Sequence, residues 1–148
     1  MIKWFKNLLL VFLLVFSFNE VKSQNSIILG PSTYNKWVLS NSTCFGCSSF
    51  YIMVTNQLYP ANDGYYYYDI YLWSNSFYTN GYAASSYVKN IKISILQPNG
   101  TYYQVLTIDY ALVPPKSMYF NGYFHLAYVY SFSAKQTIKL TWSNTEVW

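Results

Sequence analysis

Two cysteines separated by two residues, Cys44 and Cys47, form the one short motif in the sequence that is associated with chemistry. In a cytosolic protein such a pair suggests a redox or metal site. A redox pair usually sits at a helix N-terminus, whereas β-type residues follow here, and zinc needs about four ligands. Because the chain also carries the export signal described below, we expect a disulfide across the Phe45-Gly46 turn; free thiols are the alternative.

The groups that could catalyse hydrolysis are sparse. His125 is the sole histidine, and no Gly-x-Ser-x-Gly nucleophile elbow accompanies it. Four carboxylates follow the N-terminal segment, and their spacing fits neither a calcium loop nor an obvious glycosidase pair. No catalytic residue, metal site or cofactor is therefore predicted. A small secreted hydrolase using Asp69, Asp109 or His125 is the least favoured alternative.

Aromatic residues are the most unusual feature, because they make up 22% of the chain and include 18 tyrosines. A core of this size cannot enclose so many rings with every hydroxyl hydrogen-bonded, so some tyrosines must lie at the surface. Exposed rings offer rigid contact area and stack on flat ligands such as sugars. Cross-strand ladders that only stabilise a sheet are the alternative. The candidate binding residues are Tyr65, Tyr67, Tyr71, Trp73, Phe77, Tyr78 and Tyr82.

The N-terminus has the three parts of a cleavable signal peptide. Lys3 and Lys6 precede an apolar run at 8–16, and polar residues follow before a small-x-small pattern at 21–23. The apolar run is about half the roughly 20 residues that a spanning helix needs, although an uncleaved anchor is the alternative. We expect residues 1–23 to be removed, leaving a secreted or cell-surface protein (periplasmic in a bacterium) with no membrane span.

Removal of that segment takes away three lysines and one glutamate, so the formal charge falls from +4 to +2. The remaining lysines are scattered and arginine is absent, which argues against a nucleic-acid partner. The expected partners are an extracellular glycan or protein, or a second copy of the chain. Asn41 and Asn99 fit the N-glycosylation pattern, which matters only in a host that glycosylates.

The elements that must position these residues are short strands joined by turns. The pairs Asp63-Gly64, Asn80-Gly81, Asn99-Gly100 and Asn121-Gly122 predict hairpins, with type I′ turns that place both central residues at positive φ. Apolar residues alternate with polar ones between the turns. Strands are predicted at 36–41, 49–56, 65–74, 82–88, 89–97, 101–110, 123–132 and 136–142.

Strand alternation also predicts which side chains share a face. Ile91 and Ile93 should face the core together, as should Ile138 and Leu140. Rings occupy both faces of the strand 65–74, so one set must lie outside the core. In the strand 123–132, the pattern places His125 with Tyr123, Ala127 and Val129, opposite Phe124, Leu126, Tyr128, Tyr130 and Phe132.

Seven or eight short antiparallel strands predict an all-β, two-sheet sandwich in a single domain at 24–148, with a small closed barrel as the alternative. Pro114-Pro115 should mark a crossover or a sheet edge. The function expected from the aromatic residues is that of a secreted or surface-bound, non-catalytic binding module. A structural subunit that associates with itself is the alternative.

Overall fold

The structure is a computed structural model that describes residues 25–40, 48–115 and 123–147. Within these ranges it contains eleven strands and a single 3-10 turn, η1 (Pro31–Thr33). In the same ranges, no helix is long and apolar enough to span a membrane. The predicted signal peptide, the Cys44–Cys47 disulfide, the Asn41 glycosylation pattern and the Asn121-Gly122 turn lie outside the described residues and stay predictions.

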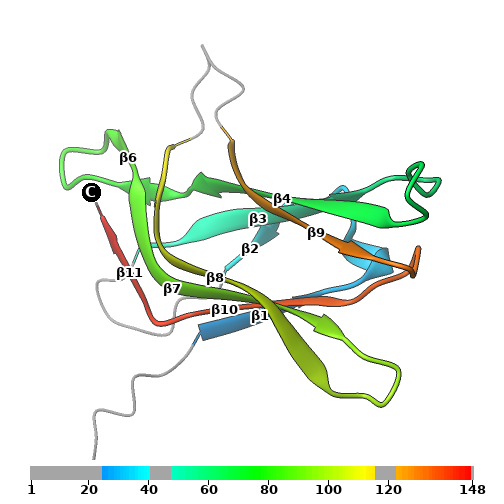
Figure 1. Ribbon diagram of the computed structural model, residues 1–148. Coiled ribbons are helices and arrows are strands. Elements are labelled where there is room, and N and C mark those ends of the chain that lie inside the picture. Colours follow the sequence, from blue (N-terminus) through cyan, green and yellow to red (C-terminus); the bar gives the residue numbers. More distant parts are fainter. Residues whose placement is uncertain (1–24, 41–47, 116–122, 148) are drawn as a thin grey trace, which may run out of the picture.

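Two antiparallel sheets pack face to face and do not close into a barrel, which confirms the predicted sandwich (Figure 1). Sheet A contains β1 (Asn25–Leu29), β10 (Ile138–Trp142), β7 (Ser86–Leu96), β11 (Asn144–Val147) and β8 (Tyr102–Val113). Sheet B contains β2 (Val38–Leu39), β3 (Phe50–Asn56), β4 (Tyr66–Ser74) and β9 (Phe124–Ser131). A small hairpin of β5 (Ser76–Phe77) and β6 (Ala83–Ala84) follows β4. The sequence had not predicted β1, β5 or β11.

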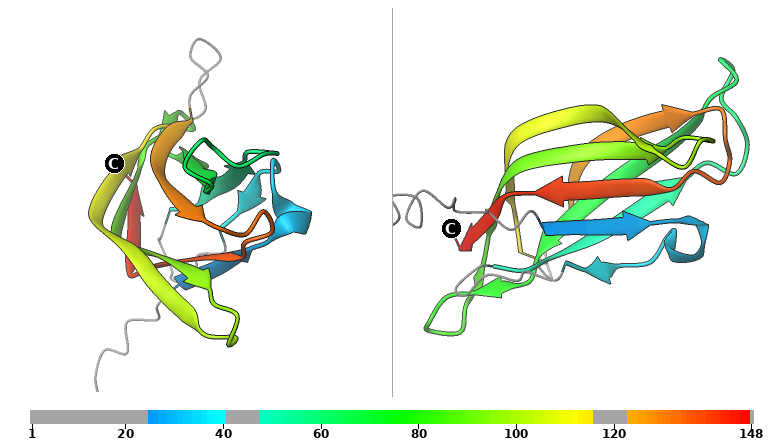
Figure 2. Two further views of the ribbon diagram at one scale, coloured as in Figure 1. Left: turned by 45° about the vertical axis from the view of Figure 1, so that its right-hand side comes forward. Right: turned by 90° about the horizontal axis from the view of Figure 1, so that it is seen from below.

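The core lies between the two sheets, which are seen as two facing layers in Figure 1 and in the left view of Figure 2. The alternating inner residues of β3, β4, β7 and β10 are almost fully buried, as the strand patterns predicted. Phe50 of sheet B and Trp142 of sheet A meet across the core with ring centroids 5.0 Å apart. At one end, the Thr145 hydroxyl donates to the Ser48 carbonyl oxygen at 2.7 Å and links the sheets directly.

The three Asx-Gly turns within the described residues share one geometry, and it is not the predicted type I′ turn. Only the glycines Gly64, Gly81 and Gly100 have positive φ, each at 83°. In each turn the glycine N–H bonds to the residue three positions back, and the closing N–H bond spans five residues. This is the three-residue loop in which a type I turn precedes a left-handed glycine. The Asx side chain accepts the N–H two residues later in all three.

The predicted break between strands 82–88 and 89–97 is a bend within one strand. Asn90 in β7 has a φ of 52°, which reverses the phase of the inward residues from Val88 to Ile91. The strands that pair with the other side of β7 are interrupted next to Asn90. There Ser143 separates β10 from β11, and its N–H donates to the Lys89 carbonyl oxygen. The side-chain pattern therefore changes phase there while the β7 ladder with β8 continues.

A β-bulge in β9 overturns the predicted faces of that strand. Ile70 of β4 pairs with Ala127 and the next residue, Tyr71, pairs with His125, so Leu126 is the extra residue. His125 therefore lies on the outer face with Tyr128 and Tyr130 rather than opposite them. Val129 is buried on the inner face. A second bulge, in β8, leaves Val105 as the extra residue between Leu106 and Gln104.

The two bulged strands lie at the free edges of their sheets. Among the described strands, β8 pairs with β7 alone and β9 pairs with β4 alone. Beyond β8, Pro115 forms a bridge with Ser74 at the end of β4, and the Pro114 carbonyl oxygen accepts the Ser74 N–H at 2.8 Å. The predicted Pro-Pro crossover is thus confirmed, because the chain passes there from sheet A to sheet B.

Candidate aromatic binding face

The strand β4 places its side chains on two faces of opposite character. Tyr68, Ile70 and Leu72 point inward and are almost fully buried. Tyr67, Asp69, Tyr71 and Trp73 point outward and are only partly buried. With alternate residues about 6.8 Å apart, these four outward positions span about 20 Å along the sheet.

Rings from three further segments join Trp73 at one end of this outer face. Tyr51 of β3 stacks on Trp73 with centroids 4.2 Å apart and planes 15° from parallel. Trp37 packs edge-on to Trp73 at 6.1 Å and also contacts Tyr123 at 5.9 Å. Tyr123 in turn contacts Tyr71 at 5.4 Å. Register explains the first contact, because Tyr51 and Trp73 are directly paired across β3 and β4.

A second cluster of rings covers the other end of the face. Tyr67 contacts Tyr128 and Tyr130 of β9, with centroids 5.7 and 6.1 Å away. Tyr65 contacts Tyr130 at 5.1 Å and Phe132 at 4.1 Å. Tyr128, Tyr130 and Phe132 are 57%, 55% and 73% exposed, so they present their rings to solvent.

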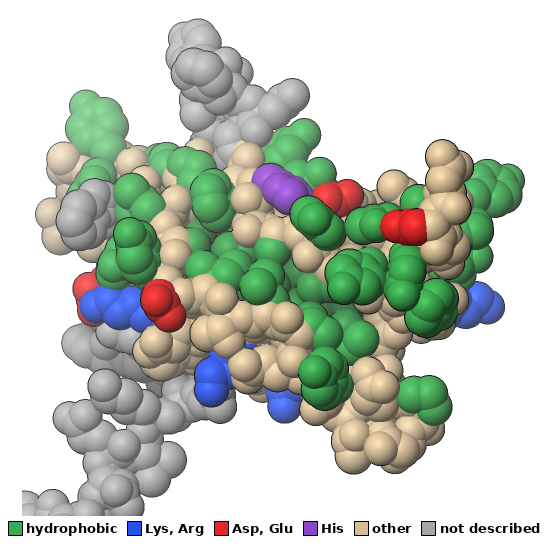
Figure 3. All heavy atoms as spheres, in the orientation of Figure 1, with side chains coloured by type: hydrophobic (Ala, Val, Ile, Leu, Met, Phe, Trp, Pro, Cys, Tyr) green, Lys and Arg blue, Asp and Glu red, His purple; other side chains and the backbone are tan. Residues whose placement is uncertain are grey.

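An acid–histidine pair lies between the two clusters. Asp69 Oδ1 is 2.9 Å from His125 Nε2, and the pair carries opposite charges when His125 is protonated. The His125 ring also lies 5.1 Å from the ring of Tyr71. In Figure 3 the one histidine of the chain lies among apolar side chains on the face turned to the viewer. We call the following set the aromatic face: Trp37, Tyr51, Tyr65, Tyr67, Asp69, Tyr71, Trp73, Tyr123, His125, Tyr128, Tyr130 and Phe132.

Hydrogen bonds and burial alter the ionisation of groups on and beside this face. The Tyr67 hydroxyl donates to Asp63 Oδ2 at 2.6 Å, which lowers the pKa of Asp63 and raises the pKa of Tyr67. Partial burial raises the pKa of Tyr71, and the negative charge of Asp69 adds to that shift. These tyrosines stay neutral hydrogen-bonding groups at neutral pH, and Asp63 stays ionised.

The structure brings four of the seven predicted binding residues together. Tyr65, Tyr67, Tyr71 and Trp73 belong to the aromatic face. The other three, Phe77, Tyr78 and Tyr82, are exposed on the β5–β6 hairpin, which projects beyond the end of β4 (Figure 1).

Sequence reasoning missed the contributions of the other strands. Tyr51 could have been found by pairing the outward positions of 49–56 with those of 65–74 across the Asp63-Gly64 turn. Tyr128 and Tyr130 were assigned together to one face, but the bulge at Leu126 concealed that His125 shares it. Trp37 and Tyr123 were included in the predicted strands 36–41 and 123–132, but they lie just outside β2 and β9. Tyr123 was correctly placed with His125, although on the face opposite Tyr128 and Tyr130.

The three residues considered for hydrolysis belong to different sheets. Asp69 and His125 are paired on sheet B, whereas Asp109 belongs to β8 of sheet A. Within the described ranges, no cluster of three or more His, Cys, Asp and Glu side chains is arranged to hold a metal ion.

Comparison with known proteins identifies no relative of this chain. No family model matches the chain, and neither a curated protein nor a solved structure matches it significantly. The functional argument therefore depends on the aromatic face and on the physical chemistry of its groups.

Proposed function

We propose that the protein is a secreted or surface-bound, non-catalytic module whose aromatic face binds carbohydrate. One observation carries the proposal: two clusters of partly exposed rings flank the Asp69–His125 pair on the open face of a single sheet. Rings that served only as a structural ladder would need no polar pair between them.

The chemistry of the face suits a sugar chain. Aromatic rings pack against the apolar face of a flat ligand, and carboxylate and imidazole groups hydrogen-bond to hydroxyls. The span of about 20 Å along β4 accommodates several sugar rings in a row. Asp69 is the acid of the face and Asp63 borders it, while no lysine belongs to it, so a neutral glycan is favoured over an acidic one.

Electrophoresis of the native protein through gels that contain neutral polysaccharides tests the proposal. We expect at least one of hydroxyethylcellulose, xylan, mannan or glycol chitin to retard the protein. Replacing an exposed ring, as in Tyr128→Ala or Tyr130→Ala, should weaken binding at least about fivefold, since stacking of a flat nucleic-acid base on an aromatic ring contributes about 1–3 kcal/mol. Asp69→Asn should weaken it as well, because a neutral amide accepts weaker hydrogen bonds than a carboxylate and cannot form an ion pair with protonated His125.

Tyr110→Ala is the matched control. Tyr110 is 62% exposed and contacts another ring, that of Tyr87, but it lies on sheet A. Its replacement should leave retardation unchanged. Equal losses in Tyr110→Ala and Tyr128→Ala would contradict the proposal. Absence of retardation, combined with a dimer in sedimentation that Tyr128→Ala dissociates, would favour self-association through this face instead.

A further inference from the structure

The free edges of β8 and β9 enclose a cleft that opens directly onto the core. It has a volume of about 920 Å³ and is lined by residues of β7, β8 and β9. A second hollow of about 860 Å³ continues it toward the β9–β10 connection, and both are lined by Ile95, Gln97 and Tyr130. Small-molecule sites are typically concave and of about 300–1,000 Å³.

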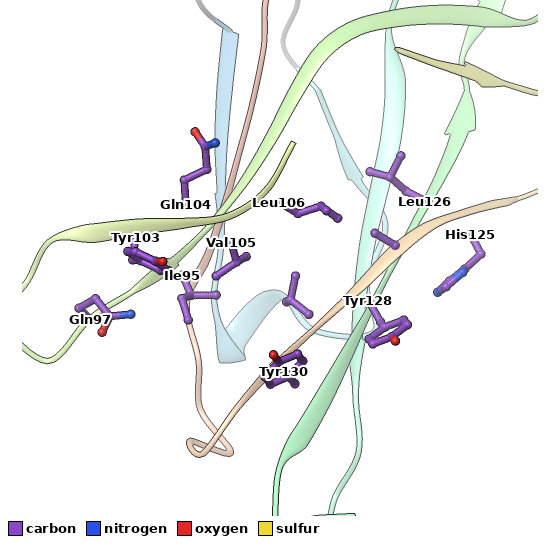
Figure 4. A pocket seen from close by; sticks show the side chains of 12 residues that line it. Ile95, Gln97, Tyr103, Gln104, Val105, Leu106, His125, Leu126, Tyr128 and Tyr130 are labelled. Atoms are coloured by element: carbon purple, nitrogen blue, oxygen red, sulfur yellow. The ribbon is translucent and has the colours of Figure 1, made fainter. Parts of the chain in front are cut away.

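The floor of the cleft is apolar. Ile95, Leu106, Leu126 and Ala127 line it, and all four are partly buried side chains packed against the core. Figure 4 shows Ile95 and Leu106 on one side of the cleft and Leu126 on the other, whereas His125 extends from the far side of β9. The cleft is thus a gap in the covering of the core, and it meets the aromatic face only along β9, at His125, Tyr128 and Tyr130.

Both edges that border the cleft are bulged beside it. Val105 is the extra residue of β8 and Leu126 is the extra residue of β9, and both side chains line the cleft. Bulges disrupt the regular ladder and discourage a further strand from pairing with an edge. They also turn side chains toward a site. This arrangement disfavours an added peptide strand and favours a ligand that contacts side chains.

The charges around the cleft define its ligand further. No lysine, arginine, aspartate or glutamate lines the larger hollow, and Lys135 lines only the second one. The one basic residue of the larger hollow, His125, is already paired with Asp69. Gln97 contributes an amide, and Tyr103 and Tyr130 contribute hydroxyls. The Gln104 amide points away from the cleft and donates to Thr107 Oγ1 at 2.8 Å (Figure 4). A ligand with a formal charge would lose its hydration without gaining an opposite charge. Complementarity therefore selects a neutral molecule.

We propose that the cleft between β8 and β9 binds a neutral, largely apolar small molecule with a few hydrogen-bonding groups. The apolar body would contact Leu106, Leu126 and Val105, and its polar groups would face the Gln97 amide and the tyrosine hydroxyls at the rim. The cleft borders the aromatic face and shares His125, Tyr128 and Tyr130 with it, but the proposal does not depend on carbohydrate binding.

Two fluorescent probes with the same ring system test the proposal. 1-N-phenylnaphthylamine is neutral and apolar, and 1-anilinonaphthalene-8-sulfonate carries one negative charge. We expect the neutral probe to bind the purified protein saturably, with a Kd at least tenfold lower than that of the sulfonate. No saturable binding of the neutral probe, or tighter binding of the sulfonate, would overturn the proposal.

Variants of β8 locate the probe. Val105 is 37% exposed, so Val105→Glu places a charge in the cleft and Val105→Trp fills it at little expected cost to folding. Each should raise the Kd of the neutral probe at least tenfold. Leu112→Glu is the control, because Leu112 is 43% exposed on the same strand and does not line the cleft.

Each combination of results has one meaning. Loss of probe binding in both Val105 variants, with Leu112→Glu unchanged, supports the site. Equal affinity in all three variants would overturn it. Tyr71→Ala alters the aromatic face at a residue that lines neither hollow, so it should leave probe binding within about twofold. Failure of the cleft and failure of the aromatic face can then be told apart.

Discussion

Two buried tyrosines that touch one another differ in what their hydroxyls do. The rings of Tyr34 and Tyr68 are 5.7 Å apart. The Tyr68 hydroxyl donates to the Ser133 carbonyl oxygen and accepts the Gln136 N–H at 3.3 Å. The Tyr34 hydroxyl is buried and finds no hydrogen-bond partner among the described residues. A buried polar atom without a partner costs free energy, whereas a paired one does not.

Removing each hydroxyl should therefore have opposite effects. Tyr34→Phe is expected to leave the free energy of unfolding unchanged or to raise it by about 1 kcal/mol, because an unsatisfied group disappears. Tyr68→Phe should lower it by about 1–2 kcal/mol, because Ser133 and Gln136 lose their partner. Urea unfolding followed by tryptophan fluorescence measures both. A larger loss in Tyr34→Phe than in Tyr68→Phe would show that this account of the pair is wrong.

The turns are the elements in which sequence and backbone conformation are most tightly tied. Gly64, Gly81 and Gly100 all have positive φ, and nothing lies within 4 Å of the position that a Cβ would take. A side chain at these positions would therefore lower the free energy of unfolding through its unfavourable backbone conformation and not through a clash with a neighbouring residue. Gly30 differs, because its φ of −125° is open to every residue.

Replacing glycine by alanine at these two kinds of position separates the effects. Gly100→Ala should lower the free energy of unfolding by about 1–2 kcal/mol, which is the cost of a left-handed conformation in an L-residue. Gly30→Ala should stay within about 0.5 kcal/mol, since its added Cβ meets Thr137 Oγ1 at an ordinary 3.6 Å. Thermal unfolding of both variants checks this. Similar losses in the two would contradict the turn geometry.

Regular strands were predictable from the sequence, and irregular ones were not. The alternation of Ile91 with Ile93, and of Ile138 with Leu140, identified their buried faces because each run has an unbroken period of two. Asn90 and Leu126 shift the alternation of inward and outward side chains within a strand. A single sequence does not show that strand pairing continues past such a shift. The short strand β1 lies beside the expected signal cleavage point, where no turn marks its start.

The candidate site was predictable only along one strand. The outward rings of 65–74 follow from their alternation with buried residues. The rings that contact them depend on which strands pair with β4 and in what register. This pairing joins segments far apart in the chain, so it cannot be predicted from the local sequence pattern. The cleft between β8 and β9 was not predicted at all, because it depends on two free sheet edges that diverge.

At the scale of the whole molecule, buried tyrosines make stability depend on alkaline pH. Burial raises the pKa of Tyr34, with a further contribution from neighbouring Tyr68, and burial likewise raises the pKa of Tyr68. Each contributes stability that is complete below the unfolded pKa of about 10. Above that pH the unfolded chain releases protons that the folded protein retains, so the free energy of unfolding falls.

We expect the urea midpoint to decline as the pH rises from about 10 toward 12. One tyrosine that ionises only in the unfolded chain contributes a slope of about 1.4 kcal/mol per pH unit. Tyr34→Phe removes one such group and should make the decline shallower. Ultraviolet difference spectra at each pH report the fraction of ionised tyrosine independently. An equal slope in Tyr34→Phe would show that Tyr34 ionises alike in both states.

The shared geometry of the three turns also bears on how the protein ages chemically. Asn80 and Asn99 precede glycine, the context in which asparagine most readily loses its side-chain amide. Asp63 already occupies the same position, and its Oδ1 accepts the N–H two residues later just as the asparagine oxygens do. The side-chain oxygen of the asparagine, and not its amide nitrogen, makes this hydrogen bond of the turn. An aspartate arising at Asn80 or Asn99 therefore keeps the turn's hydrogen bond and removes one unit of positive net charge.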